Sequence, residues 1–241
     1  MEQKQIDEIT NYIAKFQPGC EKYLSPLCDP KDKKVLVIGS GWGTEIAWLL
    51  SKGAKEIVGI DPAPRSQIPL DIYVEKNKLK GDYQIIKGQI EDLVKEKEKY
   101  FDLVVSHNVF EHIMDLTKVF NNIPKILSEN GKVAIFTDPL YYSSVGAHLN
   151  IEPWEHLWGD LDAIKERVSN YQWHEFSNGL NKMTVSSFLK EVIDSGAIIT
   201  QFFLKPDRNL DKFHLYQDKL KNIPPADLTI EGISIELYYS S

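Results

Sequence analysis

The chain has 241 residues, of which 42% are hydrophobic and 26% charged, so it can bury the core of one large globular domain and does not have the composition of a disordered protein. The formal net charge is −7, and the lysines of residues 76–99 alternate with acidic residues, so we expect no nucleic-acid partner. The N-terminus lacks the apolar core of a signal peptide, and no apolar run reaches the roughly 20 residues that span a bilayer, so we expect a cytoplasmic protein with no membrane partner.

Residues 1–30 are expected to form an N-terminal helix and a loop. Apolar side chains recur at helical spacing within residues 3–16, and Pro18-Gly19 is expected to end this helix. Its position suits a helix that packs on the domain or covers a cofactor. Cys20 and Cys28 match neither a zinc pattern nor a disulfide framework, so both are expected to be free thiols.

Short strands and helices then alternate along the chain. Continuous apolar runs, typical of strands buried on both faces, predict strands at 35–38, 56–60, 83–87, 101–106 and 132–137. Helices are predicted between them at 44–52, 67–80 and 113–128. This alternation predicts an α/β domain with a parallel sheet and right-handed crossovers.

The last hundred residues depart from the alternation. Residues 139–182 hold three of the five tryptophans and three of the six histidines, which indicates either an inserted lid that binds the acceptor or a packed structural excursion. A helix at 184–195 and strands at 197–204 and 230–239 follow, and the two strands can pair antiparallel. We expect a single domain over residues 1–241.

The most informative functional pattern is VLVIGSGWGTE at residues 35–45, where a buried strand leads through a glycine-rich turn into a helix. Glycines allow the tight turn and let a ligand approach the backbone, and free N–H groups at the helix start favour an anionic group. A tight turn without a ligand is the alternative. A dinucleotide fingerprint would place a third glycine where Thr44 stands, which favours a cofactor without a pyrophosphate.

Two further patterns follow the next two strands. Asp61 closes the second strand, 22 residues after Gly39, where a carboxylate can accept both hydroxyls of a ribose. Its alternative role is to cap a helix as an Asp before Pro62. Residues 88–92, after the third strand, would flank an adenine or simply form a polar turn.

Together with FDLVVSHNVFEHI at 101–113, these motifs resemble the class I S-adenosylmethionine-dependent methyltransferases, in particular their type 11 branch. The resemblance runs from about Lys33 to Pro139. It implies a Rossmann-like, seven-stranded, mostly parallel sheet with helices on both faces, an antiparallel last strand and an aromatic-rich insert after strand five. It also implies S-adenosyl-L-methionine as cofactor, with S-adenosyl-L-homocysteine as product.

The resemblance assigns roles to matching positions. The glycine-rich loop would border the methionine part of the cofactor, Asp61 and Pro62 the ribose, and the segment after strand three the adenine, while Ser106 and His107 would lie beside the sulfonium. The expected cofactor-binding residues are Gly39, Ser40, Gly41, Trp42, Gly43, Asp61, Pro62, Gln89, Ile90, Glu91, Ser106 and His107.

The chain departs from the family pattern at two positions. Val37 stands where an acidic residue is common, so the contact to the methionine amino group would come from Glu45 or from a main-chain carbonyl. Gln89 stands where Asp is common, and its side-chain oxygen can still accept a hydrogen bond from the adenine amino group.

Histidine is the natural base for removing a proton from a hydroxyl acceptor near neutral pH. The candidate catalytic residues are His107 at the end of strand four and His148 and His156 in the insert, each of which could instead be a buried, hydrogen-bonded structural residue. We expect no metal. The candidate ligands for one would be Glu111 and His112, completed by His148 or His156, because some O-methyltransferases use a similar Glu-x-x-Glu-His string, in which Asn108 replaces the first acid here.

The sequence thus predicts transfer of a methyl group to oxygen or nitrogen of a small-molecule acceptor, possibly a sugar or a natural-product intermediate. The alternatives are an NAD-dependent oxidoreductase and a non-catalytic module that binds S-adenosylmethionine.

Overall fold

Seven strands form one sheet in the computed structural model, which describes residues 1–240. The order across the sheet is β3-β2-β1-β4-β5-β7-β6. The strands are β1 (Lys34–Ile38), β2 (Glu56–Asp61), β3 (Asp82–Lys87), β4 (Phe101–His107), β5 (Leu127–Thr137), β6 (Ala197–Pro206) and β7 (Ile230–Tyr239). Strand β7 pairs antiparallel with both of its neighbours, β5 and β6, and the other pairs are parallel within these residues, which confirms the predicted Rossmann-like sheet with an antiparallel last strand.

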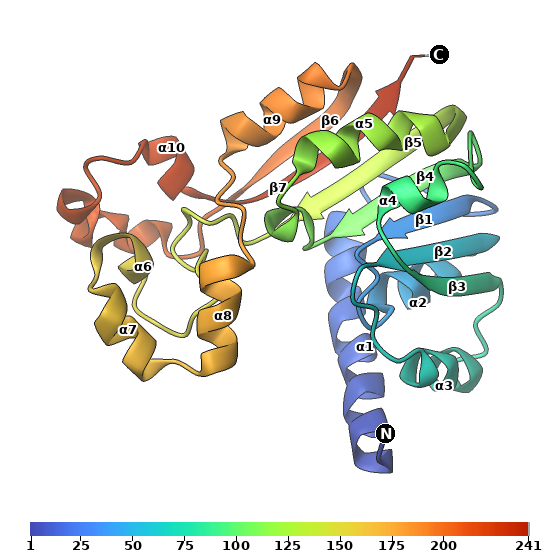
Figure 1. The fold of residues 1–241 in the computed structure, drawn as a ribbon, viewed down its shortest axis with the longest axis horizontal. Helices are drawn as coiled ribbons and strands as arrows, with labels where there is room; N and C mark the ends of the chain where they lie inside the picture. The colour runs from blue at the N-terminus through green and yellow to red at the C-terminus, as the bar shows by residue number, and fades with distance from the viewer. Residues whose placement is uncertain (241) are drawn as a thin grey trace.

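Helices cover both faces of the sheet (Figure 1). One face carries α1 (Gln3–Tyr23), α2 (Thr44–Ser51) and α3 (Ile68–Lys76), and the other carries α4 (Ile90–Leu93), α5 (Leu116–Ile126) and α9 (Val185–Asp194). The side chains of β1 alternate between the two cores, with Val35 and Val37 on the α1 side and Leu36 and Ile38 on the α5 side. Burial on both faces explains why the sequence of β1 is continuously apolar.

Helix α1 is longer than the sequence indicated. It does not end at Pro18-Gly19 but continues to Tyr23 with Pro18 inside. Cys20 in its last turns is fully buried, and the Tyr23 ring stacks on Phe136 of β5 with the ring centroids 3.9 Å apart. This packing outweighs the hydrogen bond that a proline removes from a helix.

Other boundaries also differ from the prediction, among them those of α3, which ends at Lys76 rather than at residue 80, and of α5 and β5. Helix α5 begins at Leu116 rather than at residue 113, because the Asp115 side chain caps it by accepting the Lys118 N–H at 2.9 Å. Strand β5 begins at Leu127 rather than at residue 132, since Leu127 already pairs with Phe101 of β4.

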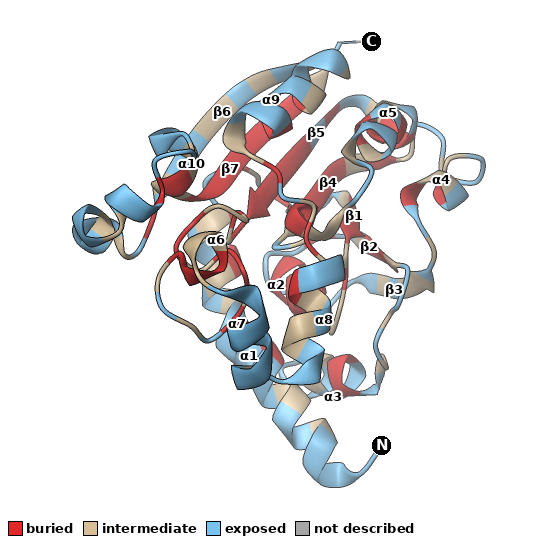
Figure 2. Ribbon diagram, turned by 60° about the vertical axis from the view of Figure 1, so that its left-hand side comes forward, coloured by how far each residue is buried: buried red, intermediate tan, exposed pale blue. Residues whose placement is uncertain are grey.

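A side lobe lies beyond the carboxyl end of β5 (Figures 1 and 2). The insert contributes α6 (Glu155–Trp158), α7 (Leu161–Arg167) and α8 (Asn170–Asn178), and the connection between β6 and β7 contributes η2 (Leu210–Leu215), η3 (Gln217–Lys219) and α10 (Pro225–Leu228). Trp154 joins the two segments: its buried ring packs against Leu220 and Leu228, and its Nε1–H donates to the Leu228 carbonyl at 3.1 Å. Within residues 1–240, no helix has the length and apolar character needed to cross a membrane.

Candidate functional site

A cavity of about 900 Å³ lies at the carboxyl ends of β1, β2, β3 and β4. Strand order reverses between β1 and β4, and ligands of open α/β sheets bind at such a switch point. The cavity collects most of the cofactor-binding positions expected from the sequence. The ones that line it are Gly39, Ser40, Gly41, Trp42, Asp61, Pro62, Gln89, Ile90, Glu91 and His107.

The turn between β1 and α2 needs its glycines for geometric reasons. Gly39 has φ +76°, and a Cβ added there would lie 2.3 Å from Cγ2 of Val109. Gly41 has φ +46°, and a Cβ there would meet no atom within 4 Å, because this part of the loop faces open space in the cavity. The loop therefore presents backbone to the cavity without a side chain in the way.

Asp61 ties the end of β2 to this loop. One carboxylate oxygen accepts the Gly41 N–H at 3.0 Å, and the other accepts the Ala63 N–H at 2.8 Å. The bond to Ala63 closes a turn rather than capping a helix, because α3 begins only at Ile68, and the carboxylate also lines the cavity. Asp61 thus links the two segments that were expected to meet at the cofactor.

Two of the expected cofactor-binding residues lie behind the cavity wall. Ser106 is fully buried, and its hydroxyl donates to the Ile38 carbonyl at 3.0 Å, which joins the ends of β1 and β4. Gly43 begins α2 with φ +85°, packed so closely that a Cβ would lie 2.6 Å from Leu70. Both residues shape the pocket wall.

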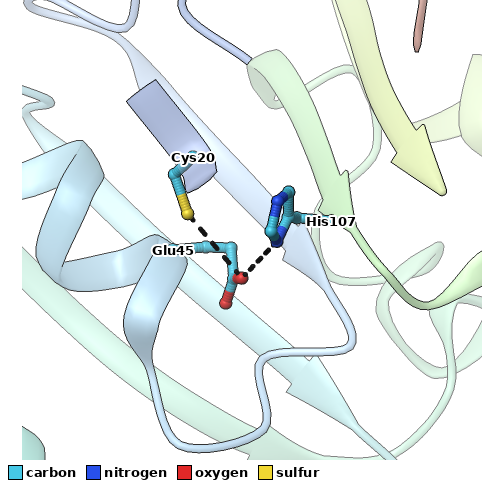
Figure 3. A group of neighbouring side chains, drawn as sticks. All are labelled: Cys20, Glu45 and His107. Carbon is cyan, nitrogen blue, oxygen red and sulfur yellow. Dashed lines mark hydrogen bonds and ion pairs between the residues drawn. The ribbon is translucent and has the colours of Figure 1, made fainter. Parts of the chain in front are cut away.

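The end of β4 brings His107 to Glu45 of α2 and Cys20 of α1 (Figure 3). The distance between His107 Nδ1 and Glu45 Oε1 is 3.2 Å, and the Cys20 thiol lies 3.9 Å from the same oxygen. Burial raises the pKa of Cys20, so its sulfur is a neutral thiol. Glu45 and His107 line the cavity, and Cys20 stands behind them.

His148 and His156 lie in the side lobe rather than on the cavity wall. His156 is buried, its Nε2–H donates to the Tyr141 carbonyl at 2.7 Å, and burial lowers its pKa to about 4. His148 contacts Glu175 through Nδ1 at 3.3 Å, and burial also lowers its pKa. Both contacts are those of structural histidines.

His112 is a cavity residue whose catalytic potential the sequence did not reveal. It lies in η1 (Phe110–His112), and its side chain is 32% exposed. Its Nδ1–H donates to the Gly179 carbonyl at 2.7 Å, because a carbonyl oxygen can only accept. This bond leaves the lone pair of the neutral ring on Nε2. In the sequence, the pair Glu111-His112 indicates only candidate metal ligands and not a catalytic base.

The metal candidates Glu111 and His112 come together with His148. Each offers one ligand atom, and these atoms lie within 4.8 Å of one another. Glu111 is 2% exposed and accepts the Thr137 hydroxyl at 2.5 Å, and burial raises its pKa to about 8. At neutral pH this carboxyl is therefore protonated.

The raised pKa of Glu111 predicts a pH-dependent stability. Between about pH 5 and 8 the folded state keeps a proton that the unfolded chain releases, so this residue costs up to about 1.4 kcal/mol of stability for each pH unit gained. Glu111→Gln removes this titration. Urea unfolding at pH 5.5 and 8 should show that the unfolding free energy of the variant increases relative to that of the wild type as the pH rises.

The exposed Glu75 provides the control for this experiment. For Glu75→Gln, the difference in unfolding free energy from the wild type should stay constant over the same range. A constant difference for Glu111→Gln would contradict the buried, protonated state of its carboxyl.

Comparison with known proteins agrees with the fold and the cavity. Residues 36–135 match a family model described as "Methyltransferase domain". A ubiquinone biosynthesis O-methyltransferase of Pelagibacter ubique is 32% identical over 107 residues, which cover 44% of this chain and 42% of that protein. A tRNA U34 carboxymethyltransferase of Cellvibrio japonicus is 35% identical over 92 residues, covering 38% of this chain and 28% of that protein.

The chain thus spans less than half the length of these two relatives. Among solved structures, a putative S-adenosylmethionine-dependent methyltransferase of Listeria monocytogenes has a TM-score of 0.60 at 15% identity, covering 93% of this chain and 99% of that one. This likeness shows the shared fold. With the family match over residues 36–135 and the glycine-rich loop and Asp61 on one cavity, it agrees with the resemblance of the chain to the class I S-adenosylmethionine-dependent methyltransferases of the type 11 branch.

Proposed function

We propose that the chain transfers a methyl group from S-adenosylmethionine to oxygen or nitrogen of a small-molecule acceptor bound in the same cavity. The observation that carries the proposal is that the glycine-rich loop, Asp61 and the segment 89–91 line one cavity. Its volume of about 900 Å³ is at the upper end of the range for small-molecule sites, which leaves room for an acceptor beside the cofactor. The bound cofactor supplies an electrophilic methyl group on its sulfonium.

The residues present fit this cofactor. The open space over Gly41 admits the methionine part beside the loop, and the Asp61 carboxylate faces the cavity where a ribose would need an acceptor. Gln89, Ile90 and Glu91 would surround the adenine at the end of β3. Binding in this pocket would hold the methyl group near the end of β4.

The mouth of the cavity is apolar and aromatic. Tyr12 and Phe16 of α1, Met114 after η1 and Tyr171 of α8 all line it and are all substantially exposed. Aromatic faces bind flat molecules and sugar rings well, which supports a ring-shaped acceptor such as a saccharide or an aromatic natural product. Methyl transfer needs this acceptor held at near-attack distance.

His112 is placed to remove the proton of such an acceptor. The Gly179 carbonyl fixes its tautomer, and the lone pair on Nε2, which lies 3.8 Å from Oε1 of Glu111, can take a proton from a hydroxyl. We favour His112 over His148 and His156 for this role, because it lines the cavity. His107 remains a second candidate, although its Nδ1 faces Glu45.

The relatives differ in what they act on. The Pelagibacter protein is named as an O-methyltransferase of ubiquinone biosynthesis, which supports methylation of oxygen, and the Cellvibrio protein acts on tRNA. We propose a small molecule rather than a nucleic acid, since the net charge is −7. The relatives named above are transferases, and they give no support to the oxidoreductase alternative.

Screening acceptors for S-adenosylhomocysteine production tests this proposal. Panels of hydroxylated aromatic compounds, saccharides, amines and bulk tRNA are incubated with the protein and S-adenosylmethionine. We expect product with one small-molecule class. Product with tRNA alone would contradict the acceptor class, and cofactor binding without turnover on any panel or on metabolite extracts would favour the non-catalytic module.

A further inference from the structure

Three side chains that carry different metal-binding atoms meet beside the cavity. Cys20 of α1 offers a sulfur, Glu45 of α2 an oxygen and His107 of β4 a nitrogen, and these atoms lie within 4.8 Å of one another (Figure 3). Oε1 of Glu45 is 3.2 Å from Nδ1 of His107 and 3.9 Å from the sulfur of Cys20. Ligand atoms around a tetrahedral ion with bonds of about 2.0–2.3 Å are roughly 3.3–3.7 Å apart. Small side-chain movements would therefore give these atoms the spacing of a metal site.

The charge of the cluster also suits a metal ion. Glu45 is 8% exposed, and its only ion-pair partner among residues 1–240 is His107, with no lysine or arginine beside it. Buried charges in proteins are paired or coordinate metals. The Glu45 carboxylate and a Cys20 thiolate together would neutralise a divalent ion, so the site would bury no net charge.

The other carboxylates that line the cavity already have their donors. Asp61 accepts two backbone N–H groups, and Asp115 accepts the N–H that caps α5. Glu91 forms an ion pair with Lys118. In the part of the chain that the structure describes, Glu45 is thus the cavity carboxylate whose contacts are limited to a histidine and a thiol.

His107 and Cys20 can both present a lone pair to an ion. Nε2 of His107 is buried and has no hydrogen-bond partner within residues 1–240, so no contact there prevents the neutral ring from carrying its proton on Nε2 and offering Nδ1. The Cys20 thiol is protonated without a metal, because burial raises its pKa. A coordinating thiol loses this proton, so binding would form a metal–sulfur bond and release one proton to the solvent.

The kinds of donor atom indicate the class of ion. Thiolate and imidazole ligands favour zinc and related ions, whereas magnesium and calcium prefer oxygen ligands. Glu45 and His107 line the cavity and Cys20 stands behind them, so an ion can enter from the cavity. We propose that Cys20, Glu45 and His107 bind a divalent ion of the zinc class, with one coordination position open to the cavity.

The sequence does not reveal this site, because its ligands come from three separate elements and only the fold brings them together. Zinc motifs are recognised by closely spaced cysteines and histidines, and none of these three residues has such a neighbour at that spacing. The proposal does not depend on methyl transfer, and its test does not require turnover.

Cobalt(II), a coloured substitute for zinc, tests the proposal on the wild-type protein after treatment with a chelator. We expect one cobalt ion per chain to give the near-ultraviolet charge-transfer band of a thiolate ligand. Zinc should displace this ion and abolish the band, and excess magnesium should not. The cluster of Glu111, His112 and His148 contains no sulfur, so cobalt held there would not give the band. Absence of the band in the wild type would overturn the proposal.

Cys20→Ser and Cys28→Ser are a matched pair, because the chain has two cysteines and Cys28 lies outside the cluster. We expect the charge-transfer band to disappear in Cys20→Ser and to keep its wild-type intensity in Cys28→Ser. A band that survives in Cys20→Ser, or that is lost in Cys28→Ser, would overturn the assignment.

Glu45→Gln tests the carboxylate separately, since it removes the charge and keeps the shape. Zinc affinity, measured by displacement of bound cobalt, should fall at least about 10-fold, because even the loss of an outer-shell partner commonly lowers metal affinity by about 10- to 100-fold. Glu75→Gln removes one exposed charge on α3 and should leave the affinity as in the wild type. An unchanged zinc affinity in Glu45→Gln would contradict the three-residue site.

Discussion

Asp61→Ala is expected to weaken S-adenosylhomocysteine binding by at least about 100-fold. The substitution removes the proposed acceptor for two ribose hydroxyls, each of which would be a charged hydrogen bond worth about 1.5–3 kcal/mol. It also frees the Gly41 N–H, which the carboxylate holds at 3.0 Å, so the glycine-rich loop loses its tie to β2. Isothermal titration measures the loss directly.

Asp61→Asn separates these two contributions. Its side-chain oxygen can still accept one backbone N–H. The glycine-rich loop should therefore keep more of its wild-type position than in Asp61→Ala, although the negative charge is lost. We expect an intermediate affinity. If Asp61→Ala bound S-adenosylhomocysteine as tightly as the wild type, the carboxylate would have only the turn-capping role seen in its bond to Ala63.

His112→Asn should lower kcat by about 100- to 10,000-fold on the acceptor found by screening, the usual range for loss of a general base. The asparagine amide can still donate to the Gly179 carbonyl that holds His112, so the local fold should survive. S-adenosylhomocysteine affinity should change far less than kcat.

His156→Asn is the matched control for this experiment. His156 lies in the side lobe, and its Nε2–H bonds to Tyr141. We expect its substitution to lower stability more than kcat. A large loss of kcat in this variant, with a normal rate for His112→Asn, would return catalysis to the lobe histidine predicted from the sequence.

The sheet was predictable because its strands are apolar on both faces and its turns carry local signals. Val35 to Ile38 lead straight into the glycine loop, and Asp61 closes the next strand, so both land at the same edge of a parallel sheet. The cavity that these segments line follows from topology, and topology follows from the alternation of strands and helices.

Long-range packing set the features that the sequence did not reveal. Pro18 is a local stop signal, but the burial of Cys20 and the stacking of Tyr23 on β5 carry α1 past it. Likewise, the sequence predicts Ser106 as a cofactor-binding residue, but its hydroxyl donates to the Ile38 carbonyl behind the cavity wall. Where a helix ends and which way a side chain bonds here depend on contacts with residues distant in sequence.

The roles of the histidines depended on the same kind of contact. The aromatic insert contains His148 and His156, but the folded chain places both in the lobe, where His156 is buried and His148 half-buried. The tautomer of His112 is set by Gly179, a residue 67 positions away. No local pattern identifies such a partner.

Titration of the wild-type protein with S-adenosylhomocysteine and with NAD tests the central claim most directly, namely that the loop after β1 and the carboxylate after β2 together hold one adenosyl group without a pyrophosphate. We predict one S-adenosylhomocysteine bound per chain, displaced by S-adenosylmethionine, and no heat from NAD. Binding of NAD with no binding of S-adenosylhomocysteine would contradict the account.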